Sequence, residues 1–170
     1  LNSWTPSVWS LINSVRNAEG IQQQLVTIPA QYKATTGSLG TARKMTELTY
    51  TIYYSVTNDY VPPSIWAVDQ LADSPNTVAL AVEVTDFSAN IVRVVATYTI
   101  GDGLWHSVDL APDQENIWRT TANASLPRSD KLEFFIQAVD ASGNVAIHDN
   151  KGQYFGLGIF QVFMPLIRND

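Results

Sequence analysis

Residues suited to catalysis are scarce in this sequence. It contains two histidines, His106 and His148, and no cysteine. Neither histidine lies in a Gly-x-Ser-x-Gly or His-Glu-x-x-His pattern, the arrangements that set a base beside a nucleophile or a zinc ion. The absence of cysteine also removes thiol nucleophiles and cysteine-ligated zinc. Because a serine nucleophile needs a positioned base, the sequence predicts that the chain is not an enzyme.

Acidic and amide side chains in predicted turns offer a different chemistry. Asp86 and Asn90 lie between two predicted strands, and Asp140 and Asn144 begin and end an Asp-Ala-Ser-Gly-Asn turn. Loop carboxylates and amides supply the hard oxygen ligands that calcium prefers, so these four residues are the candidate calcium ligands. Turn chemistry alone also explains Asp140 and Asn144, since Asp binds backbone N–H groups and Asn tolerates left-handed backbone. The sequence therefore requires no cofactor and leaves a structural calcium ion as an alternative.

Five tryptophans raise a second binding chemistry. Exposed indole rings stack on the faces of sugar rings, so Trp66, Trp105 and Trp118 are the candidate residues for binding a carbohydrate. All three fall on or beside predicted strands, where a tryptophan equally serves as a filler between sheets. Solvent exposure separates the two interpretations. Trp4 and Trp9 are expected to hold an N-terminal helix against the body of the protein.

Short apolar segments fill the second half of the chain. We expect strands at residues 65–69, 77–85, 91–100, 105–110, 117–121, 132–140 and 145–148. Turn signals such as Gly101-Asp102-Gly103 separate them, and none has a helical period. About seven short strands within fewer than a hundred residues is the spacing typical of an antiparallel β-sandwich.

The N-terminal region gives a weaker pattern. Residues 5–20 begin with Thr-Pro, continue with apolar residues at helical spacing and end at a glycine, which predicts a short amphipathic helix. Residues 24–32 are typical of a strand broken by Pro29, and residues 34–42 are typical of a loop. Residues 48–56 alternate with a period of two, which predicts a half-buried strand. An Asn-Asp-Tyr-Val-Pro-Pro stretch at residues 58–63 then marks a boundary, because consecutive prolines cannot continue a ladder.

The last predicted hairpin carries a resemblance to known modules. It reads Phe-Phe-Ile-Gln-Ala-Val-Asp-Ala-Ser-Gly-Asn-Val-Ala over residues 134–146, and Asn-Lys-Gly-Gln-Tyr-Phe follows at residues 150–155. This resembles the closing hairpin of the fibronectin type III-like and immunoglobulin-like modules of large secreted bacterial proteins, as does the Gly-Asp-Gly turn that leads to Trp105. The resemblance implies an accessory module without catalytic residues, of the kind that stands beside a protease or a von Willebrand factor A-like domain.

Charge limits the partners that the chain can bind. Sixteen acidic residues against ten Lys and Arg give a net charge of −6, and no basic run occurs. Nucleic acids and anionic membranes both need clustered cations, so neither is an expected partner. No window reaches the roughly 18 apolar residues that a membrane-spanning helix needs. The remaining candidates are neighbouring domains of a parent protein, other extracellular proteins and carbohydrates.

Together these patterns predict an all-β chain. An immunoglobulin-like, fibronectin type III-like antiparallel β-sandwich occupies residues 61–155, after a helix-and-strand extension at residues 1–60. An apolar strand at residues 156–170 is expected to pack back on the body together with the N-terminal segment. Each of these two elements is apolar and needs a partner, so they can bury each other.

The chain begins with Leu1 and not with Met, so we expect a piece of a longer secreted protein whose signal peptide lies outside it. The favoured function is a non-catalytic structural, interaction or adhesion domain at the C-terminal end of a larger extracellular bacterial protein. The alternative is a carbohydrate- or calcium-binding module attached to an extracellular enzyme or to a von Willebrand factor A-like domain.

Overall fold

The protein is all-β in the computed structural model, which describes residues 3–54, 57–72 and 74–157. These residues form twelve strands and no helix. In chain order the strands are β1 (Ser10–Asn17), β2 (Gly20–Thr27), β3 (Ala30–Ala34), β4 (Gly40–Lys44), β5 (Ser64–Ala72), β6 (Thr77–Thr85), β7 (Ile91–Thr99), β8 (His106–Gln114), β9 (Ile117–Arg119), β10 (Leu126–Pro127), β11 (Glu133–Asp140) and β12 (Val145–His148).

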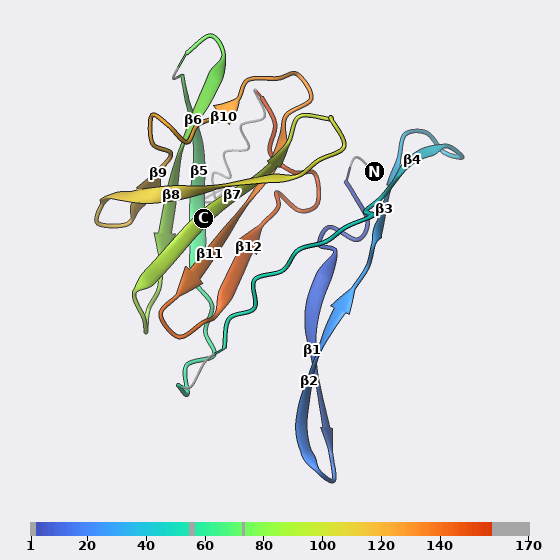
Figure 1. Ribbon diagram of the computed structural model, residues 1–170, viewed down its shortest axis with the longest axis vertical. Coiled ribbons are helices and arrows are strands. Elements are labelled where there is room, and N and C mark those ends of the chain that lie inside the picture. The colour runs from blue at the N-terminus through green and yellow to red at the C-terminus, as the bar shows by residue number, and fades with distance from the viewer. Residues whose placement is uncertain (1–2, 55–56, 73, 158–170) are drawn as a thin grey trace, which may run out of the picture.

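Eight of the strands form one antiparallel sheet, which we call the body (Figure 1). Its order is β10-β6-β9-β8-β7-β11-β12. β9 and β10 share one edge of β6, and β5 pairs with the opposite edge. Strand β8 belongs to two halves of this sheet, because its first part pairs with β7 and its last part with β9. The register shifts between Pro112 and Gln114, where the strand bends from one half to the other. β5 and β12 come close to each other, so the sheet curls into a nearly closed, barrel-like shape.

The interior of the body is filled by the inward residues of β6, β7 and β11. Every second residue of β6 is buried in the core, as the period-two geometry of a strand requires. The fully buried members of this core are Leu80, Val82, Val94, Ala96, Leu126, Phe134, Ile136 and Ala138. The Phe155 ring stacks on Phe134 with a centroid distance of 5.3 Å. Removing this apolar area from water is the main stabilising term of the fold.

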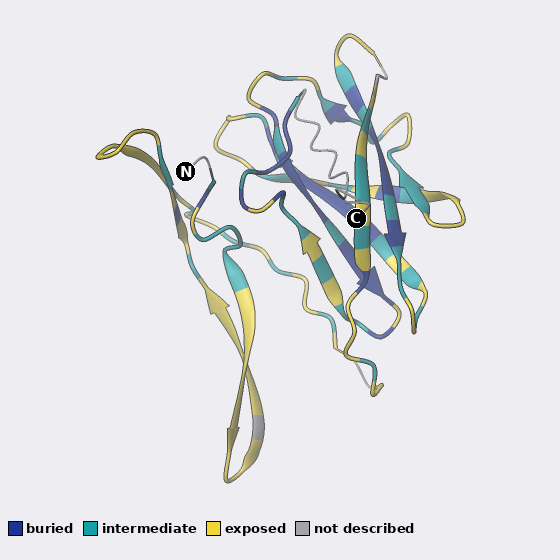
Figure 2. Ribbon diagram, turned by 180° about the vertical axis from the view of Figure 1, so that it is seen from behind, coloured by how far each residue is buried: buried dark blue, intermediate teal, exposed yellow. Residues whose placement is uncertain are grey.

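Two hairpins lie outside the body. β1 and β2 pair from Ser10 with Thr27 to Asn17 with Gly20, and β3 pairs with β4. Figure 1 shows the β1–β2 hairpin extending away from the body, and Figure 2 shows that its residues are exposed along nearly its whole length. We call this hairpin the arm.

The helix expected at residues 5–20 is wrong. Residues 10–17 are strand β1, and Gly20 ends a tight turn with a φ of +129°, which glycine adopts without steric cost. The apolar residues that gave the helical spacing pair across the hairpin instead, Leu11 with Val26 and Ile12 with Leu25. In a short segment, apolar spacing alone does not separate a helix from a strand.

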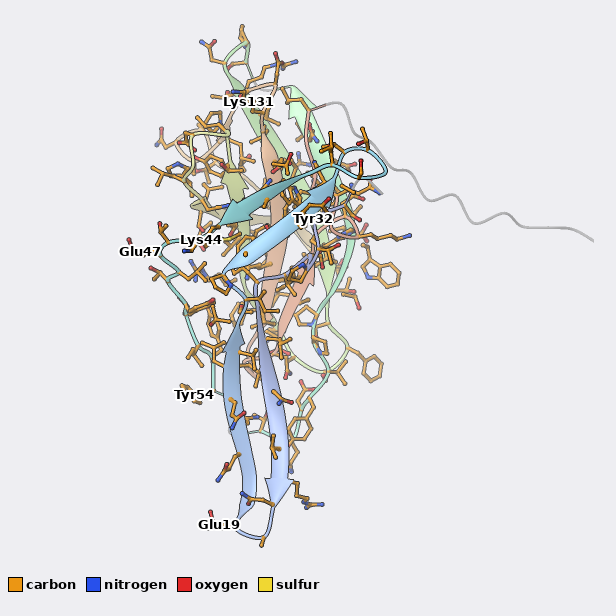
Figure 3. All side chains as sticks on the ribbon, turned by 90° about the vertical axis from the view of Figure 1, so that its right-hand side faces the viewer. Glu19, Tyr32, Lys44, Glu47, Tyr54 and Lys131 are labelled. Carbon is orange, nitrogen blue, oxygen red and sulfur yellow. The ribbon has the colours of Figure 1, made fainter. Side chains whose placement is uncertain are left out.

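The strand expected at residues 48–56 is also wrong for the part that the structure describes. Residues 46–54 run without a ladder partner among the described residues, from β4 toward β5 along the outside of the body (Figure 1). Side chains make their contacts instead: the Arg93 guanidinium donates to the Tyr53 hydroxyl at 3.0 Å. Figure 3 shows Glu47 and Tyr54 on the outer surface, and Tyr54 is 82% exposed.

The predicted strands of the second half are confirmed to within a few residues. The expected loop at residues 34–42 is wrong at its end, where β4 begins at Gly40. The short strand β10 gave no sequence signal. The expected apolar strand at residues 156–170 lies almost wholly outside the described residues. No helix in the described part of the chain could cross a membrane.

Candidate functional site

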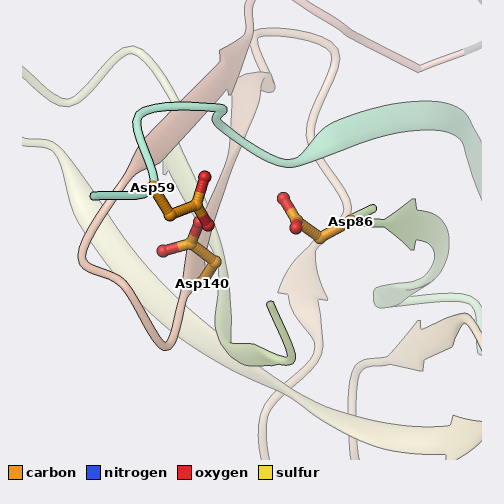
Figure 4. A group of neighbouring side chains, drawn as sticks. All are labelled: Asp59, Asp86 and Asp140. Atoms are coloured by element: carbon orange, nitrogen blue, oxygen red, sulfur yellow. The ribbon is translucent and has the colours of Figure 1, made fainter. Parts of the chain in front are cut away.

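Three carboxylates meet at one end of the body, and we call them the aspartate cluster. Asp59 comes from the segment before β5, Asp86 from the loop that follows β6, and Asp140 from the end of β11. One oxygen from each lies within 4.8 Å of the other two. Figure 4 shows Asp59 and Asp140 side by side, with the Asp86 carboxylate directed toward them. The fold therefore brings together acidic groups that are 81 residues apart at most (140 − 59).

Local turns fix the orientation of these carboxylates. The Asp140 oxygens accept from the backbone N–H and the side-chain amide of Asn144, at 2.8 and 2.9 Å. The Ser88 hydroxyl donates to Asp59 at 2.8 Å and has a longer contact with Asp86 at 3.2 Å. The Asn144 amide also donates to the backbone carbonyl of Asp59 at 3.2 Å. These hydrogen bonds therefore link all three segments that carry the aspartate cluster.

Hydrogen bonding favours the charged form of Asp59. The pKa of Asp59 is lowered, first by the Val61 backbone N–H and then by the hydroxyls of Ser88 and Ser142. Asp140 is 1% exposed. None of the ion pairs formed by the described residues involves the three cluster aspartates. Within the part of the chain that the structure describes, the cluster therefore has no compensating positive charge, and carboxylates this close repel one another when ionised.

Asp86 has an unused acceptor. Its Oδ1 accepts from the backbone N–H groups of Ser88 and Ala89 at 2.8 and 2.7 Å. Its Oδ2 is buried and has no hydrogen-bond partner among the described residues. A buried, unpaired carboxylate oxygen is costly. A hard divalent cation among the three carboxylates would satisfy this oxygen and neutralise the repulsion.

The structure therefore brings together two of the four residues predicted as calcium ligands, Asp86 and Asp140. Asn144 orients Asp140 through its amide N–H groups. Asn90 is outside the cluster and lines a neighbouring hollow. Asp59 is not among the residues predicted from the sequence, because Asn58-Asp59 there indicates only a boundary before the prolines. An acidic residue shortly before the first strand of the body is a signal that could have identified Asp59 as a candidate.

The three candidate tryptophans lie in different surroundings. Trp66 on β5 is 68% exposed, and its Nε1 donates to the Thr85 hydroxyl at 2.7 Å. Trp118 on β9 is half-buried, contacts the core and lines the same hollow as Asn90. Trp105 packs among other aromatic rings near the base of the arm. Exposure thus favours Trp66 as a binding residue and gives Trp105 a packing role.

A second cluster of side chains, which we call the joint, fastens the N-terminal hairpins to the body. Trp4, Phe135 and Tyr154 are buried in it, and Trp9 and Trp105 pack against them. The Trp4 Nε1 donates to Glu133 at 3.3 Å, and the Arg43 guanidinium donates to Glu133 at 2.6 Å. The two N-terminal tryptophans therefore do hold the N-terminal region to the body, although not from a helix.

Tyr154 is the central residue of the joint. Its hydroxyl donates to the Ser7 carbonyl at 2.9 Å and accepts from the Gln31 amide at 2.8 Å. Burial raises its pKa to about 12. Its φ of +58° is rare for a bulky residue, and the hydrogen bonds around it hold that backbone conformation. The nearby Gly152 leaves room for the N-terminal segment, since an added Cβ would lie 3.0 Å from the Trp4 carbonyl oxygen.

No known protein family, curated protein or solved structure matches this chain. The class of the protein therefore follows from its own geometry. It is an all-β protein with one curled antiparallel sheet, an aspartate cluster at one end of that sheet and an arm held by an aromatic joint.

Proposed function

We propose that this chain is a non-catalytic accessory module of a larger secreted bacterial protein, with an immunoglobulin-like, fibronectin type III-like β-sandwich as its body. The arm would serve as the surface that contacts a neighbouring domain of the parent protein. The division of β8 between two halves of the sheet and the Asp-Ala-Ser-Gly-Asn hairpin between β11 and β12 support the module class.

The exposure of the arm is the main observation that supports this proposal. Both of its faces carry exposed apolar residues: Leu11, Val15 and Val26 lie on one face, and Ile12 and Leu25 on the other. An isolated two-stranded hairpin is at best marginally stable in water. Among the described residues neither strand has a ladder partner on its outer edge, and such an edge is the element that strand addition uses for recognition. A partner strand or surface would cover both features.

The joint supports an interaction role because it fixes the arm where it leaves the body. Trp9 begins this connection, and its ring lies 5.3 Å from Phe135 of β11. The Ile28 backbone N–H donates to the Trp9 carbonyl at 2.7 Å and closes the base of the hairpin. A fixed base lowers the conformational entropy that the arm would lose on binding a partner.

Hydrogen exchange tests this role. In the isolated chain the backbone amides of β1 and β2 should exchange quickly, because the hairpin is exposed. In the full-length parent protein the same amides should exchange at least about tenfold more slowly, as a covered ladder does. The amides of β11 should be protected in both. Equal exchange rates of β1 and β2 in the two proteins would contradict the proposal.

A matched pair of variants identifies the cause of the protection. Ile12→Thr with Leu25→Thr removes the apolar pair from one face and keeps β-forming residues, so the parent should lose protection in the arm. Ser14→Thr with Gln23→Thr changes the next pair on the same face of the arm, which is polar, and should leave the protection unchanged.

A second candidate function is calcium binding by the aspartate cluster. The buried, unpaired Oδ2 of Asp86 within this uncompensated cluster favours it. The ion would join the segment before β5 to the ends of β6 and β11, and would therefore stabilise the entry of the chain into the body. This assignment is separate from the role of the arm, and either can fail without the other.

Calcium chloride at about 10 mM should raise the melting temperature of the chain by about 3–10 °C if the site has the affinity common in extracellular modules. EDTA should reverse the change. Asp59→Asn should abolish the response, whereas Asp69→Asn, an exposed aspartate outside the cluster, should keep it. A melting temperature that calcium and EDTA do not move would exclude the site.

A further inference from the structure

A hollow of about 310 Å³ lies at the end of the body between the β6–β7 loop and the β8–β9 turn. We call it the polar hollow. The lining residues that matter for binding are Asp86, Asn90, Pro112, Glu115, Asn116 and Trp118. Its volume is at the lower end of the range of small-molecule sites, which begins near 300 Å³.

The polar groups of the hollow are available to a ligand. Asn90, Glu115 and Asn116 are exposed, and their side chains form no hydrogen bond with any other described residue. Each ends in a planar group, an amide with a donor and an acceptor or a carboxylate with two acceptors. Such groups can bind two adjacent hydroxyls at once. The backbone beneath them is fixed, because the Asn116 carbonyl accepts from Val84 at 2.9 Å and the Asn90 carbonyl accepts from Ala141 at 2.8 Å.

Trp118 and Pro112 supply an apolar part of the wall, and the fold holds both in place. Trp118 is directly opposite Val82 in the β6–β9 ladder and packs against the core, so its position is set by the body. Pro112 is opposite Trp118 in the β8–β9 ladder. Trp66 does not line the hollow, but its Nε1 donates to the hydroxyl of Thr85, which does, and most of its indole is exposed. An aromatic wall with amides and a carboxylate nearby suits a ring that has apolar faces and polar edges.

The charges around the hollow restrict the chemical class of its ligand. Glu115 and Asp86 both line the hollow, no Lys or Arg is among its described lining residues, and the chain carries a net charge of −6. An anionic ligand would be repelled, and an aliphatic one would leave Asn90, Glu115 and Asn116 desolvated without partners. We propose that the polar hollow binds a neutral sugar ring, with Trp118 as its apolar contact and the side chains of Asn90, Glu115 and Asn116 as its hydrogen-bonding partners. This site is separate from the arm and does not depend on the role proposed for it.

Isothermal titration of the folded chain tests the site with four neutral oligosaccharides: cellohexaose, mannohexaose, xylohexaose and chitohexaose. Each is measured once with EDTA and once with calcium chloride, because Asp86 also belongs to the aspartate cluster. We expect at least one to bind with a Kd in the micromolar to low millimolar range. Absence of binding by all four in both buffers would overturn the proposal.

Variants then locate the binding. Asn90→Ala with Asn116→Ala should weaken it by about tenfold or more, since each lost hydrogen bond is worth up to about one such factor. Asn123→Ala changes another exposed asparagine outside the hollow and should leave the Kd unchanged. Unchanged affinity in the double variant would show that the sugar binds elsewhere and would overturn the assignment.

Trp118→Phe keeps an aromatic filler in the wall and should also weaken binding. Its melting curve shows whether the body remains folded, and the exposed asparagine pair decides the question if it does not. Binding should persist in the Ile12→Thr, Leu25→Thr arm variant, which separates this site from the proposed interaction surface.

Discussion

At the scale of single residues, His148 is the group whose protonation the fold changes most directly near neutral pH. Its ring contacts Phe155 edge-on with a centroid distance of 5.0 Å. Its Nδ1 accepts from the backbone N–H of Asn150 at 3.3 Å. Burial lowers its pKa below the usual 6.5, against the opposing charge of Asp149. The folded protein therefore favours neutral His148.

This shift makes stability depend on pH. Between the folded and the unfolded pKa of His148, the unfolded chain binds more protons, so the free energy of unfolding rises with pH. We expect stability to fall as pH drops from 7 through 6.5 toward 5, measured by urea unfolding at each pH. His148→Gln should flatten this slope, and His106→Gln should retain it. A slope identical in wild type and His148→Gln would contradict the assignment.

At the scale of elements, the joint decides whether the N-terminal hairpins stay attached to the body. The Arg43 guanidinium lies 3.5 Å from the Trp4 ring centroid and forms an ion pair with Glu133. Both contacts connect β4 to residues of other segments. A planar guanidinium combines stacking and ion pairing in a way that an ammonium group cannot.

Arg43→Ala should therefore loosen the hairpins by about 1–2 kcal/mol, which corresponds to roughly 5- to 30-fold faster thermolysin cleavage within residues 10–44. Arg43→Lys should recover only part of the protection. Lys44→Ala, at the exposed neighbouring position, is the control and should leave the cleavage rate unchanged. Equal cleavage rates in Arg43→Ala and wild type would show that the aromatic contacts alone hold the hairpins.

At the scale of the whole molecule, stability rests on the interior of the body. Ile136 is fully buried on β11, between β7 and β12. Ile136→Ala should lower the free energy of unfolding by about 2–5 kcal/mol, because it removes apolar contacts and leaves a cavity. Val145→Ala, at a position 40% exposed on β12, should cost less than about 1 kcal/mol. Urea unfolding midpoints measure both, and equal losses would contradict this placement of the core.

Much of the body could be predicted from sequence because its strands carry their own local signals. The apolar alternation of residues 77–85 matches β6, and the Asp-Ala-Ser-Gly-Asn turn matches the β11–β12 connection. The arm could not be predicted in this way, since Leu11, Ile12 and Val15 fit one helical face and also two faces of a hairpin. Residues 48–54 alternate like a strand, but a strand exists only where a partner completes its ladder.

The candidate site residues were likewise predictable from the sequence only in part. Turn chemistry in the sequence identified Asp86, Asn90, Asp140 and Asn144 individually, and residue type identified the tryptophans. Only the tertiary structure set Asp59 beside Asp86 and Asp140 and assigned Asn90 with Trp118 to the polar hollow. It also left Trp66 exposed and packed a partly buried Trp105 against the joint.

The sequence by itself determined the β class of the body, most of its strand positions, the scarcity of histidine and the absence of cysteine. These depend on local propensity, period-two patterning and composition, which each segment carries alone. The tertiary structure decided that the sheet curls until β5 and β12 meet, that the arm stands outside it and that three distant carboxylates share one site. Those features depend on pairings between segments far apart in the chain, and no local pattern specifies them.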